Sequence, residues 1–291
     1  MTLQNILVPF QNIETGVQAF NTATLLAKHF KVHLNVVHIR QKFPLPAGYY
    51  YPIAGTYFQE SMNAETAGAG RLANELKTKY EELCEQRGIA RTGMGNHDES
   101  LGTTASWDDL YSNYSFAFAR EARLADLAVV ARTKGTPSTD NSAMIEELIF
   151  QSARPVLIDT AAGPIAEFPK TVVVAWDGGR EAARALSAII PMLKEAETVF
   201  VSSIGELEPA AALPERAAAF LRLHGIHALP NHPSVRKGQS REERFLEHAE
   251  NRDADMIVMG AYSHSRWREV ILGGFTKFML HHANTPIVMA H

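Results

Sequence analysis

The sequence lacks several features on which specialised protein classes depend. Its 291 residues include a single cysteine, Cys84, so neither an internal disulfide nor a cysteine-based metal cluster can form. No run of 18 uncharged apolar residues occurs, and the first residues show no basic stretch followed by an apolar one. A formal charge of −4, without a long run of Lys or Arg, gives no electrostatic footprint for nucleic acid or an anionic membrane. We therefore expect a cytoplasmic protein with neither nucleic acid nor membrane as a partner.

Catalytic signatures are also missing. None of the 12 histidines lies in H-E-x-x-H or a comparable ligand spacing, so we predict no structural metal. There is no G-x-S-x-G elbow, Walker A loop or kinase signature, and no assignable nucleophile with its base. The segment 68–73 fits G-x-G-x-x-A, but a polar, helix-like segment precedes it instead of a strand. We name no catalytic residue, and an oxidoreductase is not expected.

The sequence does contain an internal repeat. Three apolar segments recur in the same order: 5–11 with 171–177, 125–131 with 254–260, and 155–158 with 286–289. We therefore expect two copies of one unit, residues 1–160 and 171–291. A linker over 161–170 joins them, and its glycine and two prolines suit that role.

Strands alternate with helices in both copies, which predicts an α/β fold. Each copy should form a doubly wound, five-stranded parallel sheet of Rossmann-like type, with its ligand crevice at the carboxyl ends of the first and fourth strands. Predicted strands lie near 5–10, 33–39, 106–112, 126–131 and 155–159, and near 171–176, 198–203, 228–235, 255–259 and 286–290. Predicted helices of the second copy are 180–194, 209–224, 240–251 and 274–283; the second helix of the first copy has Leu72, Leu76, Tyr80 and Leu83 on one face.

The segment from Ala254 to Ser263, followed by Gly273-Gly274, indicates a binding site. A short buried strand ends at Gly260, and a helix begins near Phe275. This strand-to-helix connection points backbone N–H groups at one spot, where an anion such as phosphate binds well.

These residues make each copy resemble a universal stress protein domain, and the whole chain resembles a tandem member of that family. The resemblance implies an adenine nucleotide alpha hydrolase-like fold, with the last strands of both copies paired in an internal pseudo-dimer; a homodimer is also compatible. Asp177 matches the acidic position after the first strand, Gly260 begins the phosphate motif, and Gly273 matches its later glycine. Ser263 stands where a second glycine is usual, and Gly274 stands where a hydroxyl residue is usual.

The expected ligand of the second copy is ATP, with Mg²⁺ as a possible companion. A carboxylate such as Asp177 can accept hydrogen bonds from an adenine amino group or a ribose hydroxyl, and glycine backbone can approach phosphates closely. Asp177 can equally serve as the N-cap of the following helix. The expected binding set is Ala175, Asp177, Ser203, Met259, Gly260, Ser263, Gly273, Gly274 and Phe275.

The first copy departs from this pattern. Gln11 replaces the acidic residue, Ala131 replaces the motif glycine, and residues 131–137 lack the motif spacing, so we expect no nucleotide there. This copy has an enlarged segment, 41–105, rich in aromatic residues near its start. Those aromatic residues can pack the connection onto its own domain or form a patch for a partner.

Two functions from different classes follow. One is a stress-response protein that binds ATP in the second copy only, with no or slow hydrolysis, and changes its contacts with an unknown protein partner. The other is a regulatory or scaffold protein that uses no nucleotide and acts through protein contacts or another small ligand.

Overall fold

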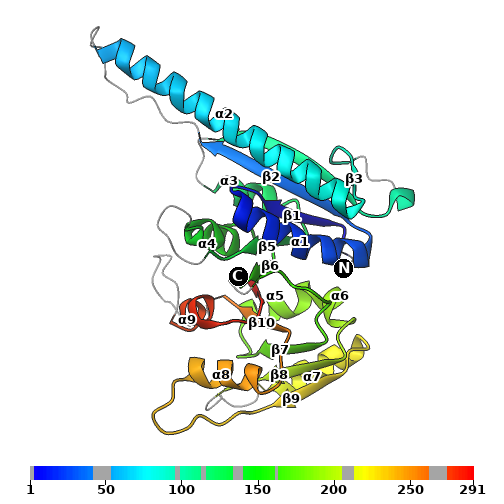
Figure 1. Cartoon of the computed structure of the whole chain (residues 1–291). Coiled ribbons are helices and arrows are strands. Elements are labelled where there is room, and N and C mark those ends of the chain that lie inside the picture. Colours follow the sequence, from blue (N-terminus) through cyan, green and yellow to red (C-terminus); the bar gives the residue numbers. More distant parts are fainter. Residues whose placement is uncertain are drawn as a thin grey trace.

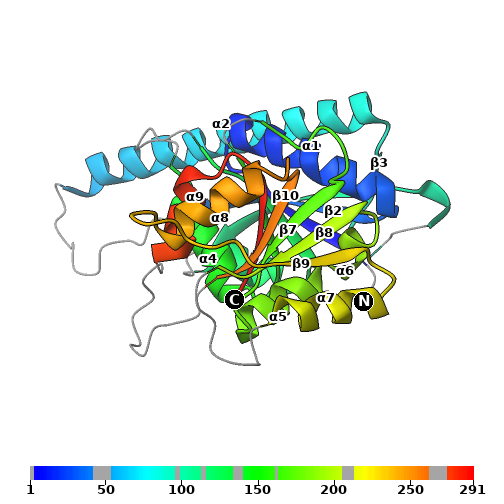
Figure 2. The same ribbon diagram turned by 90° about the horizontal axis from the view of Figure 1, so that it is seen from below.

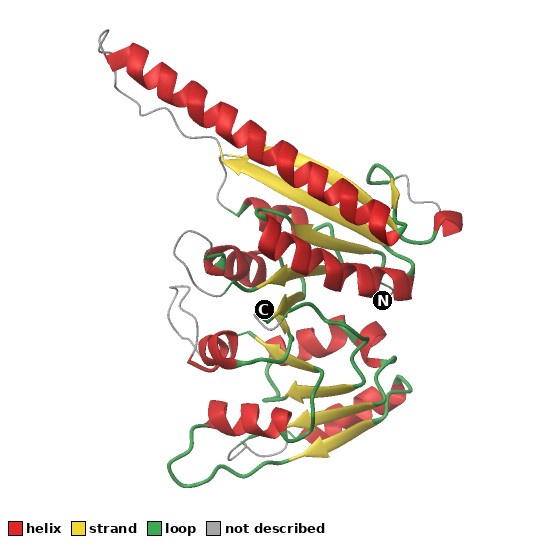
Figure 3. Ribbon diagram, in the orientation of Figure 1, coloured by secondary structure: helices red, strands yellow, loops and turns green. Residues whose placement is uncertain are grey.

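The computed structural model describes residues 3–41, 54–95, 99–112, 116–133, 140–160, 163–204, 213–261 and 274–291. Within them, one sheet of eleven strands runs through the molecule, and helices cover both of its faces (Figures 1 and 3). The predicted α/β class is confirmed. We call residues 3–160 the N-terminal half and residues 163–291 the C-terminal half.

The N-terminal half contributes six strands and the long helices. Its strands are β1 (Asn5–Pro9), β2 (His33–Gln41), β3 (Ala90–Arg91), β4 (Thr104–Ser112), β5 (Leu127–Ala131) and β6 (Val156–Asp159). Its helices are α1 (Ile13–Phe30), α2 (Ala54–Arg87), α3 (Ala117–Ala122) and α4 (Ser142–Gln151), with a 3₁₀ turn η1 (Glu99–Leu101).

The C-terminal half contributes the other five strands. They are β7 (Thr171–Ala175), β8 (Thr198–Ser202), β9 (Ala228–Asn231), β10 (Met256–Gly260) and β11 (Ile287–Ala290). The helices are α5 (Arg180–Ala188), α6 (Ile190–Leu193), α7 (Pro214–Leu223), α8 (Arg241–Glu250) and α9 (Gly274–His282).

Both halves have the same strand order. It is β4-β2-β1-β5-β6 in one half and β9-β8-β7-β10-β11 in the other, and all of these pairs are parallel. The two last strands pair antiparallel, with Leu157 opposite Val288, and so join the halves into one sheet. The expected meeting of the last strands is confirmed, and it leaves neither of these apolar edges exposed.

The central strands are apolar on both sides because helices cover both faces. In β1, for example, the buried Ile6 and Val8 belong to the cluster under α1, whereas Leu7 belongs to the cluster on the opposite face. Such runs are typical of parallel strands buried on two faces. The clusters extend across the β6–β11 seam, since Leu157 and Val288 lie in the same one.

Several predicted boundaries are wrong. The N-terminal half has a sixth strand, because β3 pairs with β4, and β4 starts at Thr104. Strand β9 ends at Asn231, short of the predicted 235. The predicted helix 180–194 divides at Ile189, and Pro191, which has no backbone N–H, lies in the first turn of α6.

Helix α2 and the strands beneath it extend past the rest of the sheet (Figures 1 and 2). Strands β2 and β4 pair over nine residues, and near their carboxyl ends Arg40 forms an ion pair with Asp109 and donates to Tyr111 Oη at 2.6 Å. Of the predicted helix face, Leu76, Tyr80 and Leu83 are buried, but Leu72 is 43% exposed. None of the helices in the described ranges is long and apolar enough to span a membrane.

Candidate functional site

The carboxyl ends of β7, β8 and β10 bring five of the predicted binding residues to one edge of the sheet: Ala175, Asp177, Ser203, Met259 and Gly260. Val174 pairs with Val258 and Ala175 pairs with Ser202, so Asp177 and Ser203 follow neighbouring strands, and Gly260 is the last residue of the strand beside β7. Trp176 N donates to Ser202 O at 2.9 Å, and Ser203 Oγ donates to Trp176 O at 2.6 Å. These bonds fix the chain after both strands. We call this edge the C-terminal crevice.

Asp177 is exposed at this edge. Its Oδ1 accepts a hydrogen bond from Gly179 N at 2.8 Å, which stabilises the turn into α5, and Gly178 takes a φ of 76° within that turn. Its Oδ2 has no partner among the described residues. The N-cap of α5 is Gly179, which makes no side-chain capping bond, so the alternative expectation that Asp177 caps this helix is wrong. The carboxylate instead stabilises the turn before the helix, and its other oxygen stays available as an acceptor for a ligand.

Gly260 allows α5 to lie directly on the end of β10. A Cβ placed on it would come 2.5 Å from Ala182 N and 2.7 Å from the carbonyl carbon of Glu181, distances that side chains do not adopt. This packing role was missed by the sequence analysis, in which the glycine was assigned to phosphate approach. The sequence motif cannot distinguish packing against α5 from close approach of a phosphate, because both require a residue without a side chain.

Glu181 is buried beside Gly260, in the first turn of α5. Burial raises the pKa of its carboxyl, but the hydrogen bond from Arg180 Nε and the Arg180 charge outweigh burial, so the pKa lies below its usual value. A negative group is favourable at a helix N-terminus. The crevice thus contains a second carboxylate that the sequence motif did not identify.

Helix α9 begins at the same side of the C-terminal half. Gly274 is exposed, and a Cβ placed on it would lie 3.9 Å from Glu242 Oε1 of α8. The ring of Phe275 packs edge-on against Phe245, with centroids 5.6 Å apart, which ties the two helices together. Ser263 and Gly273 lie outside the described residues. The side chain of Met259, another member of the predicted set, is buried in the core.

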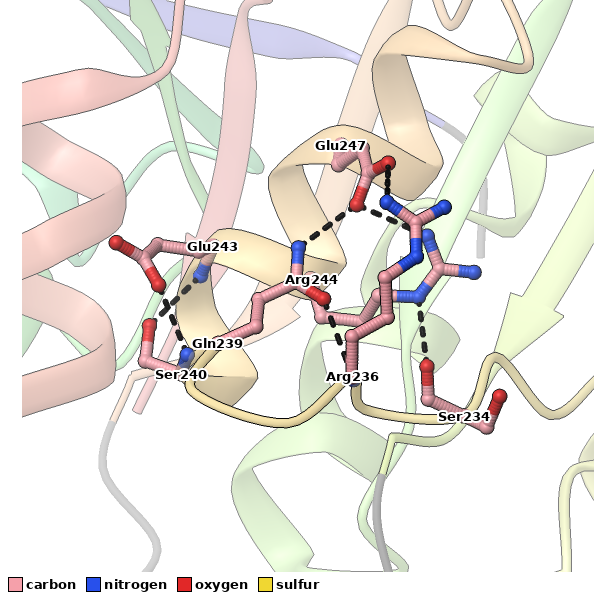
Figure 4. Close-up of polar contacts among 7 residues, drawn as sticks. All are labelled: Ser234, Arg236, Gln239, Ser240, Glu243, Arg244 and Glu247. Carbon is pink, nitrogen blue, oxygen red and sulfur yellow. Dashed lines mark hydrogen bonds and ion pairs between the residues drawn. The ribbon is translucent and has the colours of Figure 1, made fainter.

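The start of α8 is held by a polar network (Figure 4). Ser240 Oγ accepts from Glu243 N at 3.1 Å, and Glu243 Oε2 accepts from Ser240 N at 2.8 Å, a reciprocal capping box. Further along α8, the carboxylate of Glu247 accepts hydrogen bonds from Arg236, Gln239 and Arg244. This network fixes the loop between β9 and α8, and with it the position of Glu242 beside Gly274.

The corresponding edge of the N-terminal half is closed by its own side chains. Both polar atoms of the Gln11 amide bond to one backbone position: Nε2 donates to Ile39 O at 2.9 Å, and Oε1 accepts from Ile39 N at 2.9 Å. The Phe10 ring is completely buried in van der Waals contact with Gly16 and makes an edge contact with Trp107, with centroids 5.9 Å apart. An apolar plug therefore occupies this end of β1.

The segment after β5 is closed too. Asn141 Nδ2 donates to Ala131 O at 2.6 Å, and its Oδ1 accepts from Thr133 N at 3.4 Å. One side chain therefore joins the two ends of the connection, where a phosphate loop would need open backbone. In the part of the chain that the structure describes, no three His, Cys, Asp or Glu side chains form a group that could hold a metal ion.

Comparisons with known proteins agree with this fold. The model of the universal stress protein family matches residues 169–291. A universal stress protein from Archaeoglobus fulgidus superposes with a TM-score of 0.65 and 16% identity, over 98% of this chain and 97% of its own. A putative universal stress protein from Pseudomonas aeruginosa superposes with a TM-score of 0.56 and 14% identity, over 99% of this chain and 93% of its own. No curated protein matches at a significant level.

The chain is thus an α/β protein whose two halves together have the fold of these solved structures. The family model supports the resemblance for residues 169–291, and for the N-terminal half the comparisons show the fold. One further match, at a TM-score of 0.34 over 43% of this chain, is a universal stress protein in complex with cAMP. That ligand is a property of the matched protein.

Proposed function

We propose that this chain is a stress-response protein that binds an adenine nucleotide, ATP, in its C-terminal crevice only. The observation that carries the proposal is the contrast between Asp177 and Gln11 at equivalent strand ends. Asp177 is exposed with one oxygen unpartnered among the described residues, whereas both polar atoms of the Gln11 amide are bound to Ile39. Nucleotide occupancy would then change contacts with a protein partner.

The crevice offers complementary groups for such a ligand. Asp177 Oδ2 can accept from the adenine amino group or a ribose hydroxyl. Gly274 at the start of α9 leaves backbone N–H groups accessible to phosphate.

Charge in the crevice favours a metal-bound nucleotide. Glu181 lies beside Gly260 and Glu242 beside Gly274, so free phosphates would meet two carboxylates. Mg²⁺ on the phosphates would offset this repulsion. We propose little or no hydrolysis and assign no catalytic residue.

One specific observation favours the alternative of a regulatory or scaffold protein without nucleotide. Gly260 is covered by the first turn of α5, and Glu242 approaches the start of α9, so both glycines of the described motif have neighbours in the protein itself. In that case the fold would serve protein contacts or another small ligand.

We further propose that residues 1–160 and 171–291 are tandem domains of one origin, joined by the linker 161–170, and that the protein acts in the cytoplasm. The shared strand order of the halves supports the tandem arrangement.

The proposal is tested by nucleotide content and titration. Protein purified from cells is denatured, and its supernatant is analysed for adenine nucleotide; the stripped protein is then titrated with ATP, with and without Mg²⁺. Asp177→Ala should weaken binding by about 1–3 kcal/mol, because it removes a partly desolvated hydrogen bond. Gln11→Ala is the matched control at the other half and should leave binding unchanged. Equal effects of the two substitutions, or no saturable binding at all, would overturn the proposal.

A further inference from the structure

The antiparallel seam between β6 and β11 creates two related corners. At each corner the carboxyl end of one seam strand meets the first helix of its own half: α1 beside β6, and α5 beside β11. The first corner contains Asp159 and is covered by the chain that follows it. The second contains Ala290 and opens into a cleft of about 470 Å³.

Hydrogen bonds close the first corner. Thr22 Oγ1 donates to Asp159 Oδ2 at 2.6 Å and accepts from Ile165 N at 3.0 Å, and Gln18 Nε2 donates to Thr160 O at 2.7 Å. Ile165 also packs against the apolar cluster. A segment of the chain itself therefore fills this corner, held by polar side chains of α1 and β6.

The second corner has different chemistry at the equivalent positions. When Phe10 is aligned with Trp176, and β6 with β11, each polar group that closes the first corner has a counterpart in the second. The counterparts of Gln18, Thr22 and Asp159 are Arg184, Ala188 and Ala290, respectively. At these three positions the second corner therefore has two alanines, which form an apolar floor, and one arginine in place of three hydrogen-bonding side chains.

The cleft is lined by apolar groups with cations from both halves. Its apolar lining is Leu3, Ala153, Pro155, Ala188, Pro191 and Ala290. Arg154 enters from the N-terminal half, with Nε and Nη2 donating to Arg123 O at 3.1 and 2.8 Å. Arg184 enters from α5, is exposed, and has no partner among the described residues.

The lining carboxylate does not cancel these charges. Asp126 Oδ2 already accepts from Gln4 N at 2.8 Å and from Asn5 N at 3.1 Å. These two backbone donors hold the carboxylate in place without cancelling its charge. Arg154 and Arg184 together outweigh the single charge of Asp126, so these three side chains give the cleft a net positive charge; Ser187 and His291 also line it.

We propose that this seam cleft binds a small organic anion, with an apolar body and a single acidic group. Arg184 would hold the acidic group through charge-assisted hydrogen bonds, and the apolar floor around Ala188 would bury the body. The volume lies within the range of about 300–1,000 Å³ that is usual for small-molecule sites. None of the lining residues belongs to the nucleotide set, so the two ligands would bind at separate places.

Fluorescence titration with two probes tests the proposal. Anilinonaphthalene sulfonate has an apolar body with one acidic group, and phenylnaphthylamine has a similar body without charge. The native chain should bind the sulfonate saturably with one site, and the neutral probe roughly tenfold more weakly, because it makes no bond to a guanidinium. Excess Mg-ATP should not displace the sulfonate.

Three variants assign the site. Arg184→Gln should weaken the sulfonate roughly tenfold and leave the neutral probe unchanged. Ala188→Trp should abolish binding of both probes because its ring fills the cleft. Arg216→Gln on α7, which removes the same charge from an exposed position away from the cleft, should change neither. Thermal unfolding of each variant checks that the fold is kept.

The proposal is overturned if Arg184→Gln and Arg216→Gln weaken the sulfonate equally, or if Ala188→Trp with native-like unfolding still binds it. Loss of the probe in Asp177→Ala would place its binding in the C-terminal crevice and would also overturn the proposal.

Discussion

The two halves of the sheet share a strand order and differ at the ends of those strands. After β1, the Phe10 ring packs against Gly16, and the Gln11 amide bonds to the backbone of Ile39. After β7, Asp177 extends into solvent, with one oxygen on the turn into α5. Asn141 closes the connection after β5, whereas Gly260 ends β10 with no side chain. A common backbone can therefore present an exposed carboxylate and a bare glycine at the strand ends of one half, and strand ends covered by side chains in the other.

The largest expected loss of stability comes from removing the Phe10 ring, which forms the apolar plug at the end of β1. Phe10→Ala removes a fully buried ring and should cost about 3–5 kcal/mol of unfolding free energy. Urea denaturation followed by tryptophan fluorescence measures it, since Trp107 contacts the ring. The opened N-terminal half should still bind no ATP because it has no acidic residue after β1; appearance of a second ATP site would contradict this account.

A smaller effect concerns the two corners of the seam. Burial raises the pKa of Asp159 to about 7, partly offset by the hydrogen bond from Thr22, and Oδ1 has no partner among the described residues. In the unfolded chain the pKa is about 4, so the folded state binds the extra proton between the two values. The Asp159 contribution to stability is thus present at low pH and is lost as the pH rises from about 4 to 7.

Asp159→Asn should remove this pH dependence. Relative to the native chain, the variant should gain on the order of 2–4 kcal/mol of unfolding free energy between pH 4 and 8. Urea denaturation of both proteins across this range measures the gap. Parallel stability curves would show that Asp159 titrates normally.

The close approach of α5 to β10 gives the next prediction. Gly260→Ala forces a methyl group into the backbone of Glu181 and Ala182 and should destabilise by about 1–3 kcal/mol. Ala131→Gly is the reverse change at the equivalent position and should cost only about 0.5–1 kcal/mol, through backbone entropy. Chemical denaturation compares the two, and similar costs would mean that Gly260 has no packing role.

The sequence predicted the α/β class, the order of the main strands and the meeting of the last strands, because these follow from apolar runs and their repetition. It could not predict the division at Ile189 or the two-residue strand β3, since neither has a periodic signal. The closure around Gln11 also escaped it. In the sequence, a glutamine at this strand end indicates only that the acidic residue is absent. Its bonds to Ile39 join residues 28 positions apart, and no local pattern predicts them.

Ser263, which lies outside the described residues, gives the smallest expected effect. If its position requires the positive φ of the glycine usual there, serine costs about 1 kcal/mol or more. Ser263→Gly should then tighten ATP binding in a calorimetric titration at fixed salt. Weaker binding would mean instead that the hydroxyl contacts the ligand.

The number of ATP molecules bound per chain tests the central contrast between the halves most directly. Isothermal titration of the stripped protein with Mg-ATP should give one site per chain in the native protein and in Gln11→Ala, and markedly weaker binding in Asp177→Ala. Two sites per chain, or one site that survives Asp177→Ala with unchanged affinity, would contradict a nucleotide site confined to the C-terminal crevice.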